Sequence, residues 1–385
     1  MRRSHRILPV YTADVSGVCS ALYELGGMVV IHDPSGCNST YNTHDETRWY
    51  RQDSLIFISG LSEIDAILGN DEKFVADIVS AARELRPRFI ALVRSPIPYM
   101  NGTDFPALAR LIEAQTGIPA FFVLTSGMHD YVCGAGDALA ELAWRFVRPP
   151  ERVRPRSVNL LGVTPLDFAA EGSAEAMRRA LEERGWQVRS CWAMGDDLDA
   201  LACSGEAQVN LVVSAVGLPA AQVLRERFGT PWVAGAPIGA FADELCAALE
   251  CAAETGACSA PCARRVQGRS GPVVTLVGEP VSMGSLAAAL SLWFDCPTRV
   301  LCPLERHEGL LAPSDCAVRG EEGVENALKD AEIVVADPMY RYICPETVRF
   351  FELPHWAMSG RCYQKRLRSL FALTEEQCGT ILRKI

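Results

Sequence analysis

The sequence predicts an α/β protein built from three Rossmann-like units, each with a parallel β-sheet. Short apolar, β-branched runs alternate with longer amphipathic segments along all 385 residues, which is the pattern of parallel α/β layers. Glycines that end helices lead directly into strands at 117–119 and again at 229–232. A proline-rich, charged segment at 149–156 and a small, basic one at 258–272 resemble linkers. We therefore expect units at about 1–150, 151–265 and 270–385.

Each unit has recognisable strands and helices. The run Val29-Val30-Ile31 is too short for a helix and is typical of a buried parallel strand. Expected strands of the first unit are 28–32, 55–58, 88–93 and 120–124, and its helices are 71–85 and 105–115. Expected elements of the second unit are strands 158–162, 186–190 and 209–214 and a helix at 171–184. Expected strands of the third unit are 273–277 and 331–335.

Composition narrows the class of protein. The chain is 49% hydrophobic and 22% charged, so it can bury substantial cores and is not disordered. Its net charge of −10 argues against nucleic-acid binding. We find no apolar stretch long enough to span a membrane. Fifteen cysteines in a chain without a recognisable signal peptide favour a cytoplasmic protein with reduced thiols.

Two cysteines flank the first expected strand in glycine-containing loops. Cys37 ends the run Asp33-Pro34-Ser35-Gly36 just after the strand, at the sheet edge where open α/β sheets place ligands. Cys19 is expected to open a helix over 20–25, where the helix N-terminus would favour its ionised thiolate. Two such thiolates, brought together by the fold, suit an iron–sulfur cluster.

Other ligand motifs are weak. The chain has no Walker A motif, and Gly278-Glu279-Pro280 follows a strand without the spacing of a dinucleotide-binding loop. Cys258 and Cys262 lack the second pair that would complete a zinc site, so we expect linker or core cysteines there.

Several motifs together match one known pattern. They are Cys19, Asp-Pro-Ser-Gly-Cys at 33–37, Glu-Ile-Asp-Ala-Ile-Leu-Gly-Asn-Asp-Glu-Lys-Phe at 63–74, and Ser95-Pro96 with Gly102. With weaker matches at 209–212, 229–232 and 354–360, they cover nearly the whole chain. In these motifs the sequence resembles component 1 of the nitrogenase superfamily. That superfamily includes the molybdenum–iron protein, the dark-operative protochlorophyllide reductase and the nickel-sirohydrochlorin reductive cyclase.

The resemblance implies the catalytic component of a two-component, ATP-dependent reductase. A separate ATP-hydrolysing iron protein would pass electrons through a cluster at Cys19 and Cys37 to a small-molecule substrate held where the three units meet. Two thiolates per chain imply a homodimer, or a dimer with a paralogue, sharing one [4Fe–4S] cluster. Ser95 stands at the family's third cluster cysteine and could be an oxygen ligand, a hydrogen-bond donor to a cluster sulfur, or only a strand-end hydroxyl. Ser214 replaces the cysteine that holds the active-site metal cluster, so no nitrogenase-type cluster is expected there.

The resemblance also suggests pocket residues. His129 and His355 are candidate catalytic proton donors, although His129 could equally be a surface histidine. The other candidates are Tyr99, Tyr131, Trp356 and Arg361. The polar loop 38–51 is a candidate docking surface for the iron protein, with Arg48 and Arg51 as its cations; equally, it could only pack across the homodimer.

Two alternatives stay open. The chain could be a non-catalytic scaffold or carrier for assembly of a metal cofactor. It could also bind a small molecule without any cluster.

Overall fold

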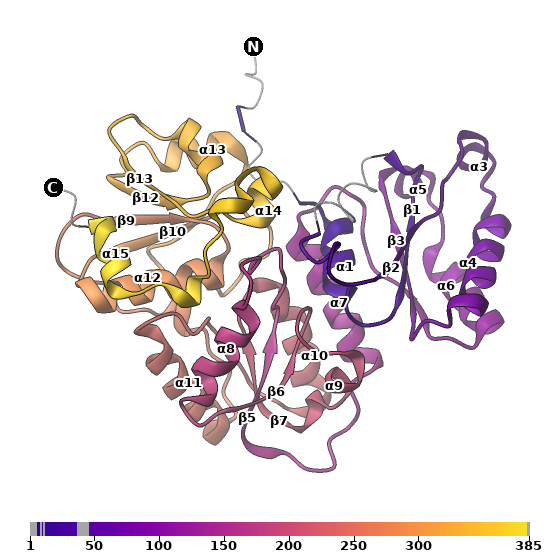
Figure 1. The fold of residues 1–385 in the computed structure, drawn as a ribbon, viewed down its shortest axis with the longest axis horizontal. Helices are drawn as coiled ribbons and strands as arrows, with labels where there is room; N and C mark the ends of the chain where they lie inside the picture. The colour runs from indigo at the N-terminus through magenta and orange to yellow at the C-terminus, as the bar shows by residue number, and fades with distance from the viewer. Residues whose placement is uncertain (1–5, 8–9, 11, 37–45, 383–385) are drawn as a thin grey trace.

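Three parallel sheets form three lobes in the computed structural model, which describes residues 6–7, 10, 12–36 and 46–382 (Figure 1). Their strand orders are β2-β1-β3-β4, β6-β5-β7-β8 and β11-β10-β9-β12-β13. Every paired strand within them runs parallel. The predicted fold class is therefore confirmed. We call the lobes units 1, 2 and 3 in chain order.

Unit 1 covers both faces of its sheet with helices. Its strands are β1 (Met28–His32), β2 (Leu55–Ile58), β3 (Ile90–Arg94) and β4 (Ala120–Phe122). Its helices are α1 (Asp14–Leu22), α3 (Glu63–Leu68), α4 (Asp71–Leu85), α5 (Pro96–Asn101), α6 (Phe105–Thr116) and α7 (Tyr131–Arg145). α4 and α6 bury one apolar face, and α1 and α7 pack together on the other.

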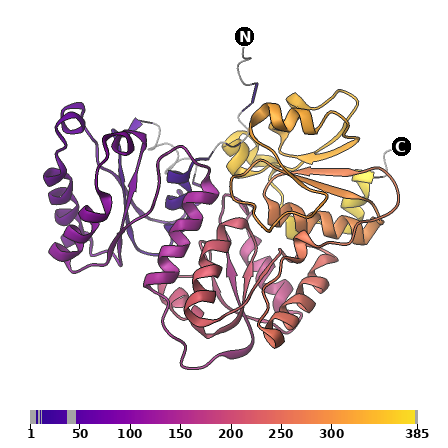
Figure 2. The same ribbon diagram turned by 180° about the vertical axis from the view of Figure 1, so that it is seen from behind.

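Unit 2 joins unit 1 through helix packing. Its strands are β5 (Arg154–Leu161), β6 (Gln187–Cys191), β7 (Ala207–Val212) and β8 (Trp232–Ala234). Its helices are α8 (Ser173–Glu182), α9 (Leu198–Ala202), α10 (Leu218–Phe228) and α11 (Phe241–Thr255). α7 packs along α10, and Figure 2 shows this contact as the seam between the two units.

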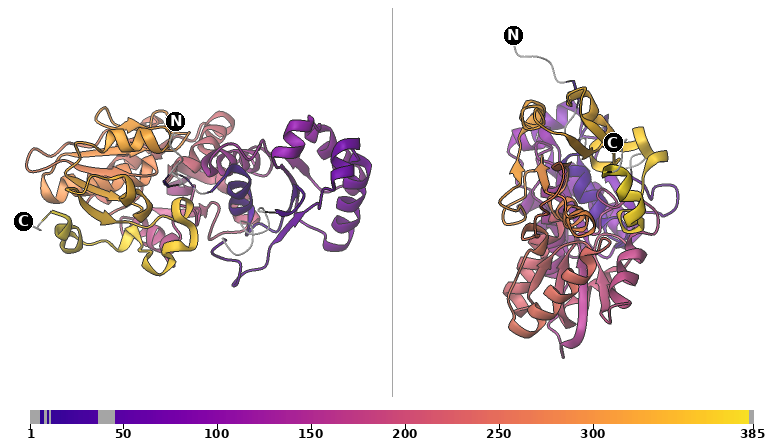
Figure 3. Two further views of the ribbon diagram at one scale, coloured as in Figure 1. Left: turned by 90° about the horizontal axis from the view of Figure 1, so that it is seen from above. Right: turned by 90° about the vertical axis from the view of Figure 1, so that its left-hand side faces the viewer.

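Unit 3 completes the molecule. Its strands are β9 (Val274–Val277), β10 (Thr298–Cys302), β11 (Cys316–Ala317), β12 (Ile333–Ala336) and β13 (Arg349–Glu352). Its helices are α12 (Pro280–Phe294), α13 (Gly320–Ala327), α14 (Trp356–Ser359) and α15 (Glu375–Leu382). Seen from above in Figure 3, units 1 and 3 lie at opposite ends of the molecule.

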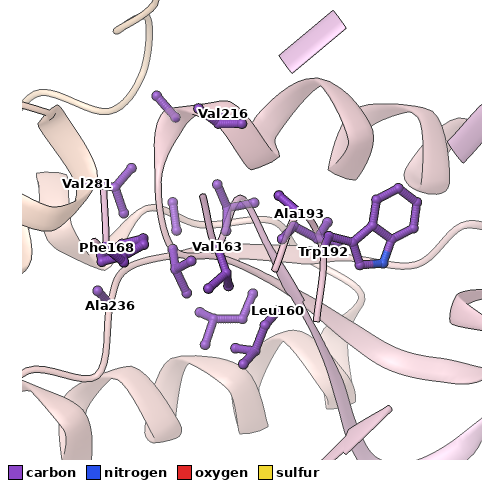
Figure 4. Packing of buried hydrophobic residues seen from close by; sticks show 14 of the residues in the cluster. Leu160, Val163, Phe168, Trp192, Ala193, Val216, Ala236 and Val281 are labelled. Atoms are coloured by element: carbon purple, nitrogen blue, oxygen red, sulfur yellow. The ribbon is translucent and has the colours of Figure 1, made fainter. Parts of the chain in front are cut away.

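One apolar core crosses the boundaries between units. Val281 of unit 3 lies beside Phe168 and Ala236 of unit 2 (Figure 4), and all three belong to the largest buried cluster. α12 is buried along almost its whole length, which explains its uniformly apolar sequence. The centre of the molecule is therefore closely packed protein.

The strand orders also fix where ligands can bind. In each sheet the second strand pairs on one side of the first strand, and the chain later returns to add strands on the opposite side of that first strand. The resulting switch points lie between β1 and β3, between β5 and β7, and between β9 and β12. Ligands of open α/β sheets bind outside the carboxyl ends of the strands at such points.

Three local expectations need correction. α1 begins at Asp14, so the helix expected over 20–25 is wrong. β5 already begins at Arg154, inside the expected first linker. In the expected second linker, Ser259 pairs with Val233 of β8, and Cys262 and Arg265 are buried. Backbone pairing with a neighbouring strand outweighs the loop-like composition of both segments. The unit boundaries at 1–150, 151–265 and 270–385 we keep as a proposal.

Candidate functional site

Cys19 lies on the buried face of α1 at the sheet edge of unit 1. It is the sixth residue of that helix and only 2% exposed, in the core that α1 forms with the strands. Burial, with the nearby Glu46 carboxylate, raises the pKa of its thiol. The expectation that Cys19 faces a helix N-terminus and is ionised is therefore wrong. Its thiol is protonated at neutral pH unless a metal displaces the proton.

Ser95 is an unusual buried hydroxyl. It follows β3 directly, precedes Pro96 of α5 and is 0% exposed. Its Oγ has no hydrogen-bond partner among the residues that the structure describes. A buried hydroxyl normally finds a partner, so this atom fits a group that the described chain does not supply. Cys37 lies outside the described residues, and its pairing with Cys19 stays a prediction.

Asp14 fixes the loop beside Ser95. Its buried carboxylate accepts hydrogen bonds from the backbone N–H groups of Ser126 at 2.9 Å and Gly127 at 2.9 Å. Burial raises the pKa of this carboxyl. A Cβ on Gly127 would lie 2.7 Å from Cδ of Pro96, so only glycine allows the loop to approach α5 this closely. Asp14 thus fixes the geometry around the candidate cluster position.

A second buried group of polar side chains lies where the three units meet. Units 1 and 2 contribute Tyr131, which begins α7, and Asp167, which follows β5, while unit 3 contributes His355 before α14 and Glu279 before α12. The Tyr131 hydroxyl donates to Oδ1 of Asp167 at 2.5 Å, and Nε2 of His355 lies 3.4 Å from the same oxygen. The rings of Tyr131 and His355 are 6.5 Å apart. We call Tyr131, Asp167, Glu279 and His355 the junction cluster.

Glu279 joins units 2 and 3 through backbone hydrogen bonds. Its carboxylate accepts from N–H of Ala215 at 2.8 Å, of Ser282 at 2.7 Å and of Val281 at 3.1 Å. Complete burial raises its pKa to about 7, and the negative charge of Asp167 adds to this effect. It is therefore a carboxyl group that titrates near neutral pH.

This carboxylate lies next to Ser214, the residue before Ala215. The Ser214 hydroxyl accepts a hydrogen bond from N–H of Val216 at 3.2 Å and is fully buried. A serine hydroxyl with this internal partner, beside a buried carboxylate, does not offer the thiolate that a nitrogenase-type metal cluster needs. The residues present at this position do not fit such a cluster.

A backbone hydrogen bond fixes His355, whereas its ring nitrogens have no well-aligned partner among the described residues. Asp337 accepts from the His355 N–H at 2.8 Å and from the Ser359 hydroxyl at 2.6 Å. Both ring nitrogens of His355 are buried without a well-aligned hydrogen bond to any described residue. These nitrogens are therefore available to hydrogen-bond a ligand.

The space beside His355 is small. A cavity of about 20 Å³, roughly one water in size, is bordered by Asp167, His355, Trp356 and Arg368. One side of it comes from 353–356 and 367–370 of unit 3. Any larger ligand would have to displace this segment.

The other predicted pocket residues are placed differently. Tyr131 and Trp356 are buried at the junction, whereas Tyr99 is 49% exposed on α5 and Arg361 is exposed. His129 is 57% exposed and its Nδ1 lies 2.7 Å from Oε2 of Glu305, so the structure does not bring it into the junction cluster.

Sequence reasoning missed Asp167 and Glu279. Glu279 carried a usable signal, because it follows a strand and precedes a helix-starting proline, a place suited to an N-cap carboxylate. The motif search tested it only as part of a phosphate loop. We find no comparable signal for Asp167.

The expected docking role of Arg48 is wrong. Its guanidinium is 9% exposed and pairs with Glu24 and Glu46, each at 2.8 Å, while also donating to the carbonyl of Ala193 in unit 2 at 3.0 Å. This arginine holds units 1 and 2 together. Arg51, by contrast, is exposed and pairs with Glu171 at 3.1 Å.

An apolar face lies beside the candidate cluster position. α3 and α5 contact each other, and each exposes large apolar side chains. These side chains, which we call the apolar face, are Ile64, Ile67, Leu68, Ile97, Tyr99 and Met100. A patch of this kind on a folded chain marks an interaction site. Among the described helices, none is both long and apolar enough to cross a bilayer.

Comparison with known proteins agrees with this architecture. A light-independent protochlorophyllide reductase component of Prosthecochloris aestuarii (strain DSM 271 / SK 413) is 26% identical over 218 residues, covering 54% of this chain and 39% of that protein. The nitrogenase iron-molybdenum cofactor biosynthesis protein NifE of Klebsiella pneumoniae is 24% identical over 226 residues, covering 54% of this chain and 49% of that protein. The match thus spans less than half the length of either relative.

Structural similarity extends further than sequence similarity. A solved structure described as "Nitrogenase Cp1 at pH 6.5" has a TM-score of 0.69 and 16% identity, covering 99% of this chain and 94% of that one. At this identity the likeness shows the fold. The family model for nitrogenase component 1 type oxidoreductases matches residues 16–264, more than half of the sequence. This chain belongs to the nitrogenase component 1 type oxidoreductase family.

Proposed function

We propose that this chain is the catalytic component of a two-component, ATP-dependent reductase that acts on a small molecule. Family membership supports an oxidoreductase or a cofactor-assembly role. The observation that carries our choice is the junction cluster, in which Tyr131, Asp167, Glu279 and His355 form a buried, titratable group between all three units. Reduction of a substrate consumes protons as well as electrons, and such a group can supply them.

The electron-entry site is proposed at Cys19 and Cys37. Two copies of the chain would together offer the four thiolates of one [4Fe–4S] cluster, which would supply one-electron transfer. The partnerless hydroxyl of Ser95 supports a hydrogen bond or ligand bond to that group. Of this set, the structure describes the Cys19 thiol and the Ser95 hydroxyl, and the chemistry of both suits an iron–sulfur cluster.

We assign the apolar face to a second copy of this chain. α5 follows Ser95 directly, so the exposed Ile97, Tyr99 and Met100 adjoin the residue expected to meet the shared cluster. Burial of this face in a dimer would remove its apolar side chains from water. The two copies would then enclose the cluster site between them. An ATP-hydrolysing iron protein would deliver electrons to this dimer.

The junction cluster would deliver protons. Nε2 of His355 lies 3.4 Å from the Asp167 carboxylate, and neither ring nitrogen has a well-aligned partner among the described residues, so this side chain would be placed to contact a substrate. Tyr131 donates to that carboxylate and sets its position. Glu279, titrating near pH 7, provides a second store for a proton. A substrate would enter by displacing the segment 353–370, where Arg368 would meet an anionic group.

A cofactor-assembly role is the second candidate. The similarity to NifE, named as a cofactor biosynthesis protein, and the water-sized cavity both favour it, because a carrier can bind its cargo outside a small central space.

One experiment separates the two functions. The anaerobically purified dimer is reduced by its iron protein with ATP, and cluster oxidation state is followed by electron paramagnetic resonance while candidate small molecules are added. Reoxidation of the cluster with formation of a reduced product supports the reductase. We expect the variant His355→Gln to keep ATP-dependent cluster reduction and lose product formation. If no reduced product forms and a metal cofactor instead copurifies and is transferred to an acceptor protein, the chain is an assembly carrier.

A further inference from the structure

Three different metal-ligating side chains meet on the surface seam between units 1 and 3. His129 precedes α7, Cys133 is the third residue of that helix, and Glu305 lies in the loop after β10. One ligand atom from each lies within 4.8 Å of the other two. We propose that these residues form a site for a borderline-soft divalent cation of the zinc class, independent of the cluster position and of the junction cluster.

The separation of the Cys133 and Glu305 ligand atoms suits tetrahedral coordination. Bonds of about 2.0–2.3 Å from zinc to nitrogen, oxygen and sulfur place neighbouring ligand atoms about 3.3–3.6 Å apart. Sγ of Cys133 is already 3.4 Å from Oε2 of Glu305. Nδ1 of His129 is 2.7 Å from the same oxygen, so this pair must separate by about 0.7 Å. A small rotation of two half-exposed side chains accomplishes that.

The hydrogen bonds at the seam point to a ligand at this place. The imidazole of His129 and the thiol of Cys133 both point at Oε2 of Glu305. A cation bound by the three residues would take the place of the protons in these two hydrogen bonds. The chemistry of the set also fits, since nitrogen, thiolate and carboxylate ligands together are typical of zinc.

The backbone around the site is fixed from the opposite unit. The Asp130 carboxylate, which caps α7, accepts the N–H of Glu305 at 2.7 Å. The next residue, Arg306, pairs with Asp137 of α7 at 2.7 Å. Glu305 is thus held on both sides by unit 1, which positions its carboxylate over α7 before any cation binds.

Two consequences follow from this placement. Three protein ligands leave a fourth position open to solvent, because His129 is 57% and Glu305 is 47% exposed. A bound cation would also crosslink unit 1 to unit 3 through its ligands, and so raise the stability of the folded chain. Since Tyr131 of the junction cluster lies between His129 and Cys133 in the sequence, the cation would hold the N-terminal end of α7 that carries this tyrosine.

The test uses the full chain with zinc as the only added metal. We expect the metal-stripped protein to take up one zinc per chain and its thermal midpoint to rise with zinc concentration. X-ray absorption at the zinc edge should show one sulfur among nitrogen and oxygen neighbours. His129→Ala, Cys133→Ser and Glu305→Gln should each lower zinc affinity by about 100-fold or more, since even the loss of a residue that only orients a ligand costs about 10–100-fold.

The matched control is Cys316→Ser, which removes an exposed cysteine of unit 3 outside the proposed site and should leave zinc binding unchanged. Circular dichroism and the metal-free midpoint show whether each variant is folded. Zinc bound equally well by wild type and by both His129→Ala and Cys133→Ser overturns the proposal. So does a wild-type chain that retains no zinc after desalting and shows no shift of its midpoint.

Discussion

Replacing Glu279 with glutamine should change how the stability of this protein depends on pH. The carboxylate is completely buried and accepts three backbone hydrogen bonds, of which the one from Ala215 joins unit 3 to unit 2. Burial raises its pKa from 4.5 to about 7, with a further contribution from Asp167. Glutamine has nearly the same shape but cannot ionise, so the variant Glu279→Gln isolates the effect of this one titration.

The sign and size of this pH dependence follow from the linkage between proton binding and folding. A carboxyl whose pKa is higher in the folded chain binds its proton more tightly there, so the free energy of unfolding falls as pH rises from 4.5 to about 7. The contribution is complete below pH 4.5 and lost above about 7. At about 1.4 kcal/mol per pH unit, this single group accounts for about 3 kcal/mol of pH-dependent stability.

The assay is urea unfolding between pH 5 and about 7.5, followed by fluorescence of the buried Trp186 and Trp192 in unit 2. The wild type should lose stability relative to Glu279→Gln as pH rises. Glu321→Gln is the flat control: although burial opposes them, hydrogen bonds from N–H of Ile7 and Arg6 hold the pKa of Glu321 below its usual value, so this carboxyl stays ionised across the assay range and its replacement should leave the pH profile almost unchanged. Parallel pH profiles for wild type and Glu279→Gln would refute the assignment.

Three further predictions concern other parts of the site. Cys19→Ala should abolish bound iron in the anaerobically purified protein, measured by elemental analysis, while replacement of an exposed cysteine leaves it intact; unchanged iron refutes the ligand assignment. Arg48→Glu should destabilise the chain by about 3–5 kcal/mol, because it leaves buried carboxylates unpaired, whereas Arg51→Glu should cost less than about 1 kcal/mol in the same urea titration. Tyr131→Phe should cost about 1–3 kcal/mol by removing the hydrogen bond to Asp167, and an unchanged unfolding midpoint would contradict that bond.

The regular elements were predictable because their signals are local. β1, β2 and α4 have the expected bounds, since an apolar β-branched run or a capped amphipathic helix is encoded within a few residues. α1 was placed too late because its first turn is fixed from a distance: the Asp14 N–H donates to the carbonyl of His129 at 3.0 Å. The hydrophobic pattern of residues 12–25 carries no information about His129, which is distant in the sequence.

The candidate site was less predictable for the same reason. Cys19 and Ser95 were found by motif, but the environment of Cys19 depends on packing against strands that follow it in the chain. Asp167 and Glu279 acquire their significance only when units 2 and 3 meet: the position of Glu279 before Pro280 indicates an N-cap but not burial between units, and Asp167 carries no signal among the 47 acidic residues of the sequence. Similarly, Arg48 was interpreted as a surface cation because its burial depends on Ala193 of unit 2.

The two buried sites are connected by one short piece of structure. Residues 12–14 run antiparallel to 129–131, with backbone hydrogen bonds from Asp14 to His129 and from Tyr131 to Thr12 at 3.0 and 3.1 Å. One end of this pairing carries Asp14, which holds the loop beside Ser95, and the other carries Tyr131, which donates to Asp167. The Thr12 N–H also donates to the carbonyl of Ala357 in α14 at 3.1 Å. Residues 12–14 are therefore tied by backbone hydrogen bonds to the start of α7 and to α14, so a displacement of this segment would be passed both to the loop beside Ser95 and to Tyr131 of the junction cluster.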